Sequence, residues 1–257
     1  MTLLDFCLRV MLSSEQLKEL GEKEFKESLT GNKDALVKAL KSRGISLQKV
    51  KDFCREKHEN VNIVLIKSVL KSGKLRGHSW EKARPSNLHL SIQNLVRDCF
   101  AGKLKIDEYL EKGNNIIKHE FFITAIHDLV EQTIIVNFND VIPAIASKCT
   151  IDFVYDSIPY DLKVTPPLKD WTYEKAKKNP EIFAKSLYEG QDTERIRESA
   201  KNSDEFNRLY LVYKEESIWE NPEKIEKMVV KIFSQKHNPF TIDVDGKKIR
   251  TLVIFLE

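Results

Sequence analysis

The segment TIDFVYDSIPYDLKVTPP, residues 150–167, restricts the fold of this 257-residue chain more than any other stretch does. Two short runs rich in β-branched and aromatic residues flank Asp156 and Ser157, and this pattern predicts a β-hairpin that reverses at those two residues. Such a loop pairs the strands so that Asp152 stands directly opposite Asp161, with their Cβ atoms about 5 Å apart. The hairpin is therefore expected to carry two carboxylates side by side.

Paired carboxylates weaken a sheet, so their presence indicates a purpose other than stability. A divalent cation removes the repulsion, and Mg²⁺ favours one or two carboxylates together with water and a phosphate oxygen. Lys163 follows Asp161 on the same face of the predicted strand, where it can neutralise a transition state or help to deprotonate water. These residues predict hydrolysis of a phosphodiester. The alternative interpretation is an exposed Asp161–Lys163 ion pair, with Asp152 protecting a strand edge.

The first part of the chain is predicted to be mainly helical. Apolar residues recur at helical spacing within residues 14–57, which predicts three helices. Residues 60–70 fit either a strand or a buried helix, residues 72–88 an exposed basic loop, and residues 88–100 a further helix. The pattern changes near Gly102, where we place a domain boundary.

The division gives a basic helical region over residues 1–104 and an α/β (α+β) domain over residues 105–257. The predicted elements of the second domain are, in order, a helix over about 106–132, a strand over 133–138, the hairpin, a helical stretch over 173–206, a strand over 208–214, a helix over 222–235 and two final strands around the Asp245-Gly246 turn. This order predicts a mixed β-sheet with helices on its faces.

Charge is distributed unevenly between the two parts. Residues 1–105 carry 21 Lys and Arg against 12 Asp and Glu, and residues 106–257 carry 21 against 27, so the net charge of +3 divides into +9 and −6. An asymmetry of this kind indicates a strongly charged partner, and double-stranded DNA is the usual one. Candidate DNA contacts in the basic region lie in the loop around residues 67–84 and on the second helix of a pair with helix-turn-helix length. They are Lys71, Lys74 and Arg76 in the loop, and Lys49, Lys51 and Arg55 on the helix.

The arrangement Ile151-Asp152, an eight-residue gap and then Asp161-Leu162-Lys163 resembles the motif of the PD-(D/E)xK nuclease superfamily. Ile151 takes the place of the proline of that motif, a residue without a chemical role. The core of the superfamily, a helix followed by three antiparallel strands, a helix and a further strand, is similar to residues 106–214 in order. The resemblance implies that Asp152 and Asp161 bind one or two Mg²⁺ ions and that Lys163 takes part in catalysis.

The first helix of such a core often supplies a further acid that supports the metal. The resemblance implies Glu120 for this role, with Glu131 as the alternative. Asp140 is a weaker alternative for the first aspartate of the motif.

Three further stretches, YDLKVTPPLKD, SLYEGQDTERIRES and NRLYLVYKEES, resemble type II restriction endonucleases. In these enzymes the helix after the lysine faces DNA, which makes Gln191, Arg195 and Arg197 candidate contacts. The resemblance implies a restriction endonuclease that acts on double-stranded DNA. One active site must be presented to both strands, and a two-fold homodimer is the usual solution. A repair or recombination nuclease and a non-catalytic DNA-binding protein remain alternatives.

Several other classes of protein lack support in the sequence. No apolar run reaches the roughly 18 residues of a membrane helix, and the first residues lack the pattern of a signal peptide, so we expect a cytoplasmic protein without membrane contact. The four cysteines are scattered, which favours reduced structural thiols. No nucleotide-binding glycine motif is present, so no nucleotide cofactor is expected. His78, His119 and His127 are taken to have no Cys or carboxylate partners at ligand spacing, so we interpret them as surface or hydrogen-bonded histidines rather than metal ligands.

Overall fold

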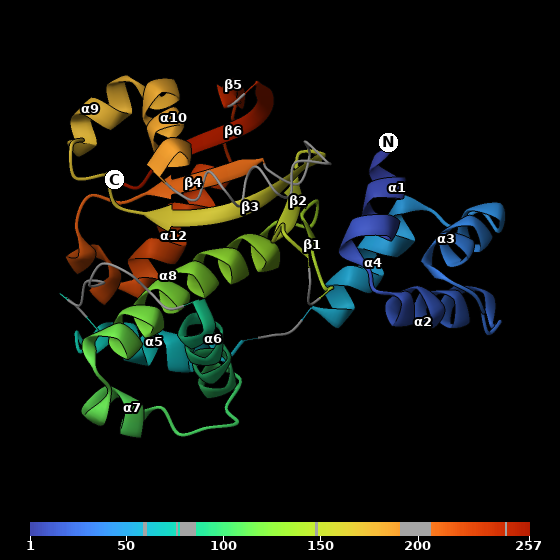
Figure 1. Ribbon diagram of the computed structural model, residues 1–257, viewed down its shortest axis with the longest axis horizontal. Coiled ribbons are helices and arrows are strands. Elements are labelled where there is room, and N and C mark those ends of the chain that lie inside the picture. The colour runs from blue at the N-terminus through green and yellow to red at the C-terminus, as the bar shows by residue number, and fades with distance from the viewer. Residues whose placement is uncertain (59–60, 76, 78–85, 147–148, 191–206, 245) are drawn as a thin grey trace. The chain divides into compact units, whose positions relative to one another are not determined.

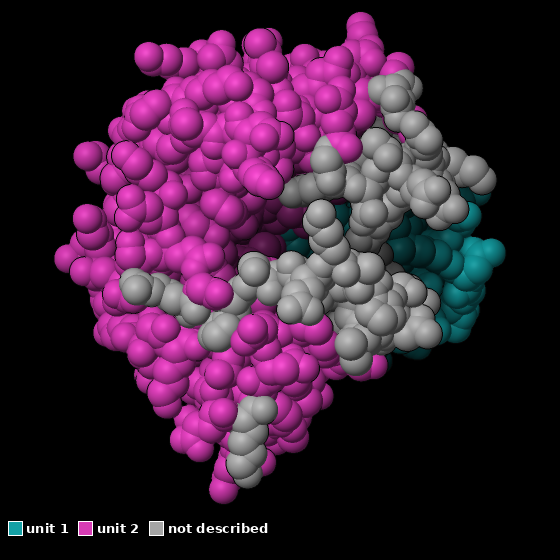
Figure 2. All heavy atoms as spheres, turned by 60° about the vertical axis from the view of Figure 1, so that its left-hand side comes forward, with its two compact units in different colours: residues 1–59, 138–161, 201–207 teal, residues 60–137, 162–200, 208–257 magenta. Residues whose placement is uncertain are grey.

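The computed structural model describes the chain except for residues 59–60, 76, 78–85, 147–148, 191–206 and 245. The chain forms two compact units (Figure 2). Unit 1 comprises residues 1–59, 138–161 and 201–207, and unit 2 comprises residues 60–137, 162–200 and 208–257. The predicted boundary near residue 104 lies inside unit 2, and the hairpin segment is divided between the two units.

The helices of unit 1 match the three that were predicted over residues 14–57. These three are α2 (Ser14–Phe25), α3 (Lys33–Ser42) and α4 (Leu47–Lys57). They are preceded by α1 (Leu3–Phe6), which continues into a π-helical turn at Cys7–Met11. The side chains of Ser13, Asn32 and Ser46 accept hydrogen bonds from the first turns of α2, α3 and α4. Each cap satisfies a backbone N–H that the helix itself leaves without a partner, which is why these helices begin where they do.

Unit 1 also contains two short strands and the beginning of a third. These are β1 (Ile142–Pro143), β2 (Phe153–Tyr155) and β3 (Ile158–Thr165), of which the last continues into unit 2. β2 pairs antiparallel with β3 in the predicted register, with Phe153 opposite Tyr160 and Tyr155 opposite Ile158. The predicted hairpin is therefore confirmed.

The hairpin turn has an unusual backbone. Asp156 and Ser157 have φ angles of 48° and 63°, the left-handed conformations that a two-residue type I′ turn requires. Asn-Gly is the preferred sequence there because a side chain in this region meets the following carbonyl oxygen. Ser157 occupies the position that usually holds glycine.

The core of unit 1 joins segments from both ends of its sequence. Ile142, Ile151 and Val154 pack in one apolar cluster with buried residues of all four helices. Polar contacts tie the same segments together, because the Gln16 side chain donates to the carbonyl oxygen of Ile145, which is 129 residues away. This shared core explains why β1, β2 and the beginning of β3 belong to the helical unit.

Unit 2 contains the remaining helices and strands described. The helices are α5 (Ile63–Lys71), α6 (Ser86–Phe100), α7 (Asp107–Lys112), α8 (Asn115–Asn137), α9 (Tyr173–Lys178), α10 (Pro180–Gly190), a 3₁₀ helix at Glu216–Glu220, and α12 (Pro222–Phe233). The strands are the end of β3, β4 (Arg208–Val212), β5 (Phe240–Val244) and β6 (Lys247–Phe255). The predicted strand at 208–214, helix at 222–235 and final strand pair are confirmed.

The described strands form a mixed sheet in the order β1-β2-β3-β4-β6-β5. β4 runs parallel to β6, and β5 runs antiparallel to β6. In unit 2, α9 and α10 cover one face of the sheet while α8 and α12 cover the other (Figure 1). The predicted class, a mixed sheet with helices on its faces, is confirmed. No described helix has the length and apolarity that a membrane span needs.

Helix α8 corrects two predictions. The predicted strand at 133–138 is its last part, and the predicted helix over 106–132 is broken into α7 and α8 at Gly113. The β-branched run stays helical because tertiary packing overrides local propensity: Ile134 and Ile135 are buried, on a helix that packs against α5, α6 and α12. The break falls at Gly113, where a Cβ would lie 2.1 Å from the carbonyl oxygen of Tyr109.

Replacing Ser157 by glycine is expected to stabilise the protein by about 0.5–1 kcal/mol, since the relief of left-handed strain exceeds the entropy that glycine loses. Urea unfolding measures this change. Ser234 provides the matched control, because it ends α12 with φ −73°, and Ser234→Gly should not stabilise. Equal effects of the two substitutions would contradict the turn assignment.

Candidate active site on the β2–β3 hairpin

Asp152 lies at the start of the hairpin, tied by its backbone to strands on both sides. Its N–H donates to the carbonyl oxygen of Tyr160 in β3 (2.9 Å), and its carbonyl oxygen accepts from the N–H of Ala144, next to β1 (2.8 Å). Its side chain is partly buried. Two backbone hydrogen bonds therefore fix the position of this aspartate.

Asp161 is buried in β3. Its N–H donates to the carbonyl oxygen of Asn207 (3.0 Å), immediately before β4. The paired ladder of β2 and β3 ends at Phe153 and Tyr160, and Asp152 and Asp161 are the next residues outward. The N–H of Asp152 bonds to the carbonyl oxygen of Tyr160 rather than to Asp161. The two aspartates thus occupy neighbouring positions on adjacent chain segments of unit 1.

Lys163 and Glu120 belong to unit 2. Lys163 is partly buried and follows Asp161 by two residues in the same strand, so the alternation of a strand places both on one face. Glu120 is fully buried in the first half of α8.

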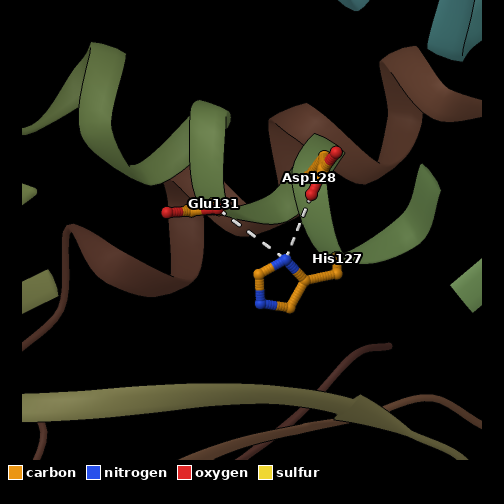
Figure 3. Close-up of side chains that lie close together, drawn as sticks. All are labelled: His127, Asp128 and Glu131. Atoms are coloured by element: carbon orange, nitrogen blue, oxygen red, sulfur yellow. Dashed lines mark hydrogen bonds and ion pairs between the residues drawn. The ribbon is translucent and has the colours of Figure 1, made fainter. Parts of the chain in front are cut away.

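Glu131, the alternative to Glu120, lies in a cluster of α8 with His127 and Asp128 (Figure 3). Nδ1 of His127 is 3.3 Å from Oδ1 of Asp128 and 3.7 Å from Oε2 of Glu131. Glu120, His127 and Glu131 are seven and four residues apart, a spacing that keeps them on one face of the helix. The interpretation of His127 as a histidine without carboxylate neighbours is wrong, and the i, i+4 spacing in HDLVE was the signal that could have shown it.

Several predicted DNA contacts are engaged within the protein. Lys49 forms an ion pair with Glu24 (2.5 Å) and lies over the ring of Phe25. Lys71 forms an ion pair with Glu223 (2.5 Å) and holds the pKa of that carboxyl below its ordinary value. A phosphate would have to replace these carboxylates before it could bind either lysine.

Arg55 has a structural role in unit 1. Its Nη1 donates to the carbonyl oxygens of Phe138 and Val141, both at 3.1 Å. These hydrogen bonds attach α4 to the chain that leads into β1. The guanidinium of Arg55 is therefore committed to backbone carbonyls of its own unit.

The other predicted contacts differ in their surroundings. Lys51 is partly buried and Lys74 is exposed, and neither forms an ion pair with any residue in the described part of the chain. Asp140 is exposed before β1. Arg76, Gln191, Arg195 and Arg197 lie outside the described residues, as does His78.

Buried thiols offer no second candidate site. Burial raises the pKa of Cys7 to about 12 and that of Cys99 to about 11. The reactive thiolate is therefore strongly disfavoured at neutral pH. This agrees with the prediction that these cysteines are structural.

An open hollow of about 550 Å³ lies in unit 2, away from the predicted residues. Its walls include Glu174, Glu215 and Glu257 together with Lys214 and Lys224. Acidic and basic groups both line it, so the lining favours no single charge of ligand. It carries no functional assignment.

Comparison with protein-family models found no match, and neither did comparison with curated proteins or with solved structures.

Replacing Arg55 by alanine is expected to destabilise the protein by roughly 1.5–3 kcal/mol, the range for hydrogen bonds that involve a charged group. The neighbouring Lys51→Ala should change stability by less than about 0.5 kcal/mol. Urea unfolding of both variants measures the difference. A stable Arg55→Ala variant with altered DNA sequence preference would instead assign Arg55 to base contacts.

Proposed function

We propose that the protein is a Mg²⁺-dependent endonuclease that hydrolyses phosphodiester bonds of double-stranded DNA, with a core of the PD-(D/E)xK kind. The observation that supports the proposal is the hairpin register, in which Phe153 pairs with Tyr160 and Asp152 and Asp161 are the next residues outward on the two chain segments. Lys163 shares the strand and face of Asp161. The same three residue types in this order make up the motif of that superfamily.

The order of elements supports the proposal independently of the motif. α8 precedes β1, β2 and β3, the helices α9 and α10 follow, and β4 comes next. The strands β1-β2-β3-β4 are also neighbours in that order in the sheet. A helix, three antiparallel strands, a helix and a further strand are what the resemblance implies.

The chemistry of the donors fits Mg²⁺, because carboxylate oxygens are the ligands that this hard cation prefers. In the proposed site Asp152 and Asp161 would hold the cation. Such a cation polarises the phosphate and lowers the pKa of a bound water. Lys163 then supplies positive charge where the transition state develops negative charge.

The proposed contacts with DNA follow from which basic groups are available. Lys74 and Lys51 have no competing carboxylate among the described residues, so they are the better candidates for phosphate contacts in the helical segments. Lys49, Lys71 and Arg55 are less suited, because each is already bound within its unit. A type II restriction enzyme that acts as a homodimer is the form of the proposal that accounts for cleavage of both strands.

Incubation with plasmid and Mg²⁺ tests the proposed activity. Discrete fragments support site-specific cleavage, and a smear supports a repair-type or non-specific nuclease. An unchanged plasmid under conditions in which the protein binds DNA would favour a non-catalytic DNA-binding protein.

Asp161→Asn is expected to abolish cleavage while DNA binding is retained or strengthened, because one negative charge facing phosphate is removed. Asp156→Asn is the matched control, since it changes an exposed aspartate of the same hairpin and should leave the rate unchanged. Cleavage rates and gel-shift affinities of the two variants measure the effects. Near-normal cleavage by Asp161→Asn would remove this residue from the site.

Lys163→Ala is expected to lower the cleavage rate by roughly 10²–10³-fold, the value of one electrostatic donor in a transition state. Lys163→Arg should also fail, because guanidinium cannot act as a base and occupies space differently. Lys169→Ala provides the control at an exposed lysine shortly after β3. A normal rate for the arginine variant would limit Lys163 to a diffuse positive potential.

A further inference from the structure

The side chains of His127, Asp128 and Glu131 converge on one side of α8. Their ligand atoms all lie within 4.8 Å of one another, and the Nδ1 atom of the imidazole points toward both carboxylates (Figure 3). All three side chains are largely but not fully buried, with 27%, 16% and 15% of their surfaces exposed. They are thus partly desolvated and still accessible to a small ion.

We propose that this cluster is a second cation site, which binds one divalent transition-metal ion such as Zn²⁺. Ligands about 2.0–2.2 Å from a tetrahedral zinc ion are separated from each other by about 3.3–3.6 Å. Nδ1 of His127 is 3.3 Å from the Asp128 oxygen and 3.7 Å from the Glu131 oxygen. The imidazole nitrogen therefore already lies at about the ligand spacing of zinc from both carboxylates, and all three ligand atoms lie within 4.8 Å of one another.

The ligand types select the metal. An imidazole nitrogen with two carboxylate oxygens suits zinc, whereas Mg²⁺ favours oxygen ligands alone. This separates the cluster from the proposed site of Asp152 and Asp161, which offers only oxygen. Three protein ligands leave a fourth position of zinc open for water or substrate.

The site does not depend on the proposed nuclease activity. Its three ligands lie within five consecutive residues of one helix, so its geometry is set by α8 alone. It assigns Glu131 to a transition metal rather than to the proposed Mg²⁺ site. The opposing interpretation is that a protonated His127 alone offsets the two carboxylates, and metal binding distinguishes the two.

Calorimetric titration of the full chain with Zn²⁺, without DNA, tests the site. Glu131→Gln and His127→Gln should each weaken binding of one Zn²⁺ ion by at least roughly 10–100-fold, because even residues that only orient a metal ligand have effects of that size. His237→Gln and Glu111→Gln are the controls, since they change a histidine held by the Ile232 carbonyl and an exposed acid of α7. Both controls should bind Zn²⁺ like the unchanged protein.

Two further measurements keep the outcome unambiguous. Repeating the titration in an Asp161→Asn background removes any zinc bound at the hairpin, and the cluster site should persist there. Thermal unfolding without metal shows whether the variants fold, and Zn²⁺ should then raise the midpoint of the unchanged protein but not of Glu131→Gln. Zinc binding that is absent, or equal in the cluster variants and their controls, would overturn the site and leave an ion pair only.

Discussion

The pairing of β2 with β3 is the interaction on which the candidate active site depends. Side chains alternate along a strand, so a shift of the register by one residue would exchange the faces on which every side chain lies. The turn at Asp156 and Ser157 prevents such a shift, because its two left-handed residues fit a two-residue loop and do not fit a longer loop. The strain of these residues is the cost of a fixed register.

The hairpin could be predicted from sequence because local features determine it. A strand pattern on each side of a polar dipeptide specifies both the reversal and the pairing, and the three helices of residues 14–57 were likewise specified by apolar spacing and capping residues. The last part of α8 could not be predicted in this way. Its run of Thr133, Ile134 and Ile135 has strand propensity, but all three residues are buried in the fold, and such tertiary packing overrides local propensity.

The sequence predicted the helices and strands better than it predicted which basic side chains are available to bind DNA. The excess of basic residues in the first part of the sequence indicated a surface for DNA, but counting charges does not show which of them are paired. In the first 57 residues, several basic side chains form ion pairs with acidic residues of the same segment. They are Arg9, Lys23, Lys41, Arg43, Lys49 and Lys57. Exposed pairs of this kind add little to stability, yet they reduce the positive potential that phosphates would meet.

The shared core of unit 1 has a consequence for the order in which the chain folds. Helices α1–α4 leave the ribosome first, but the residues that complete their apolar core, such as Ile151 and Val154, are synthesised much later. The intervening segment belongs to unit 2, so the early helices must wait with exposed apolar surface while most of another unit is made. Contacts so distant along the chain slow folding and lengthen the period in which aggregation competes. Production of this protein should therefore respond to the speed of translation and to chaperones that shield apolar helices.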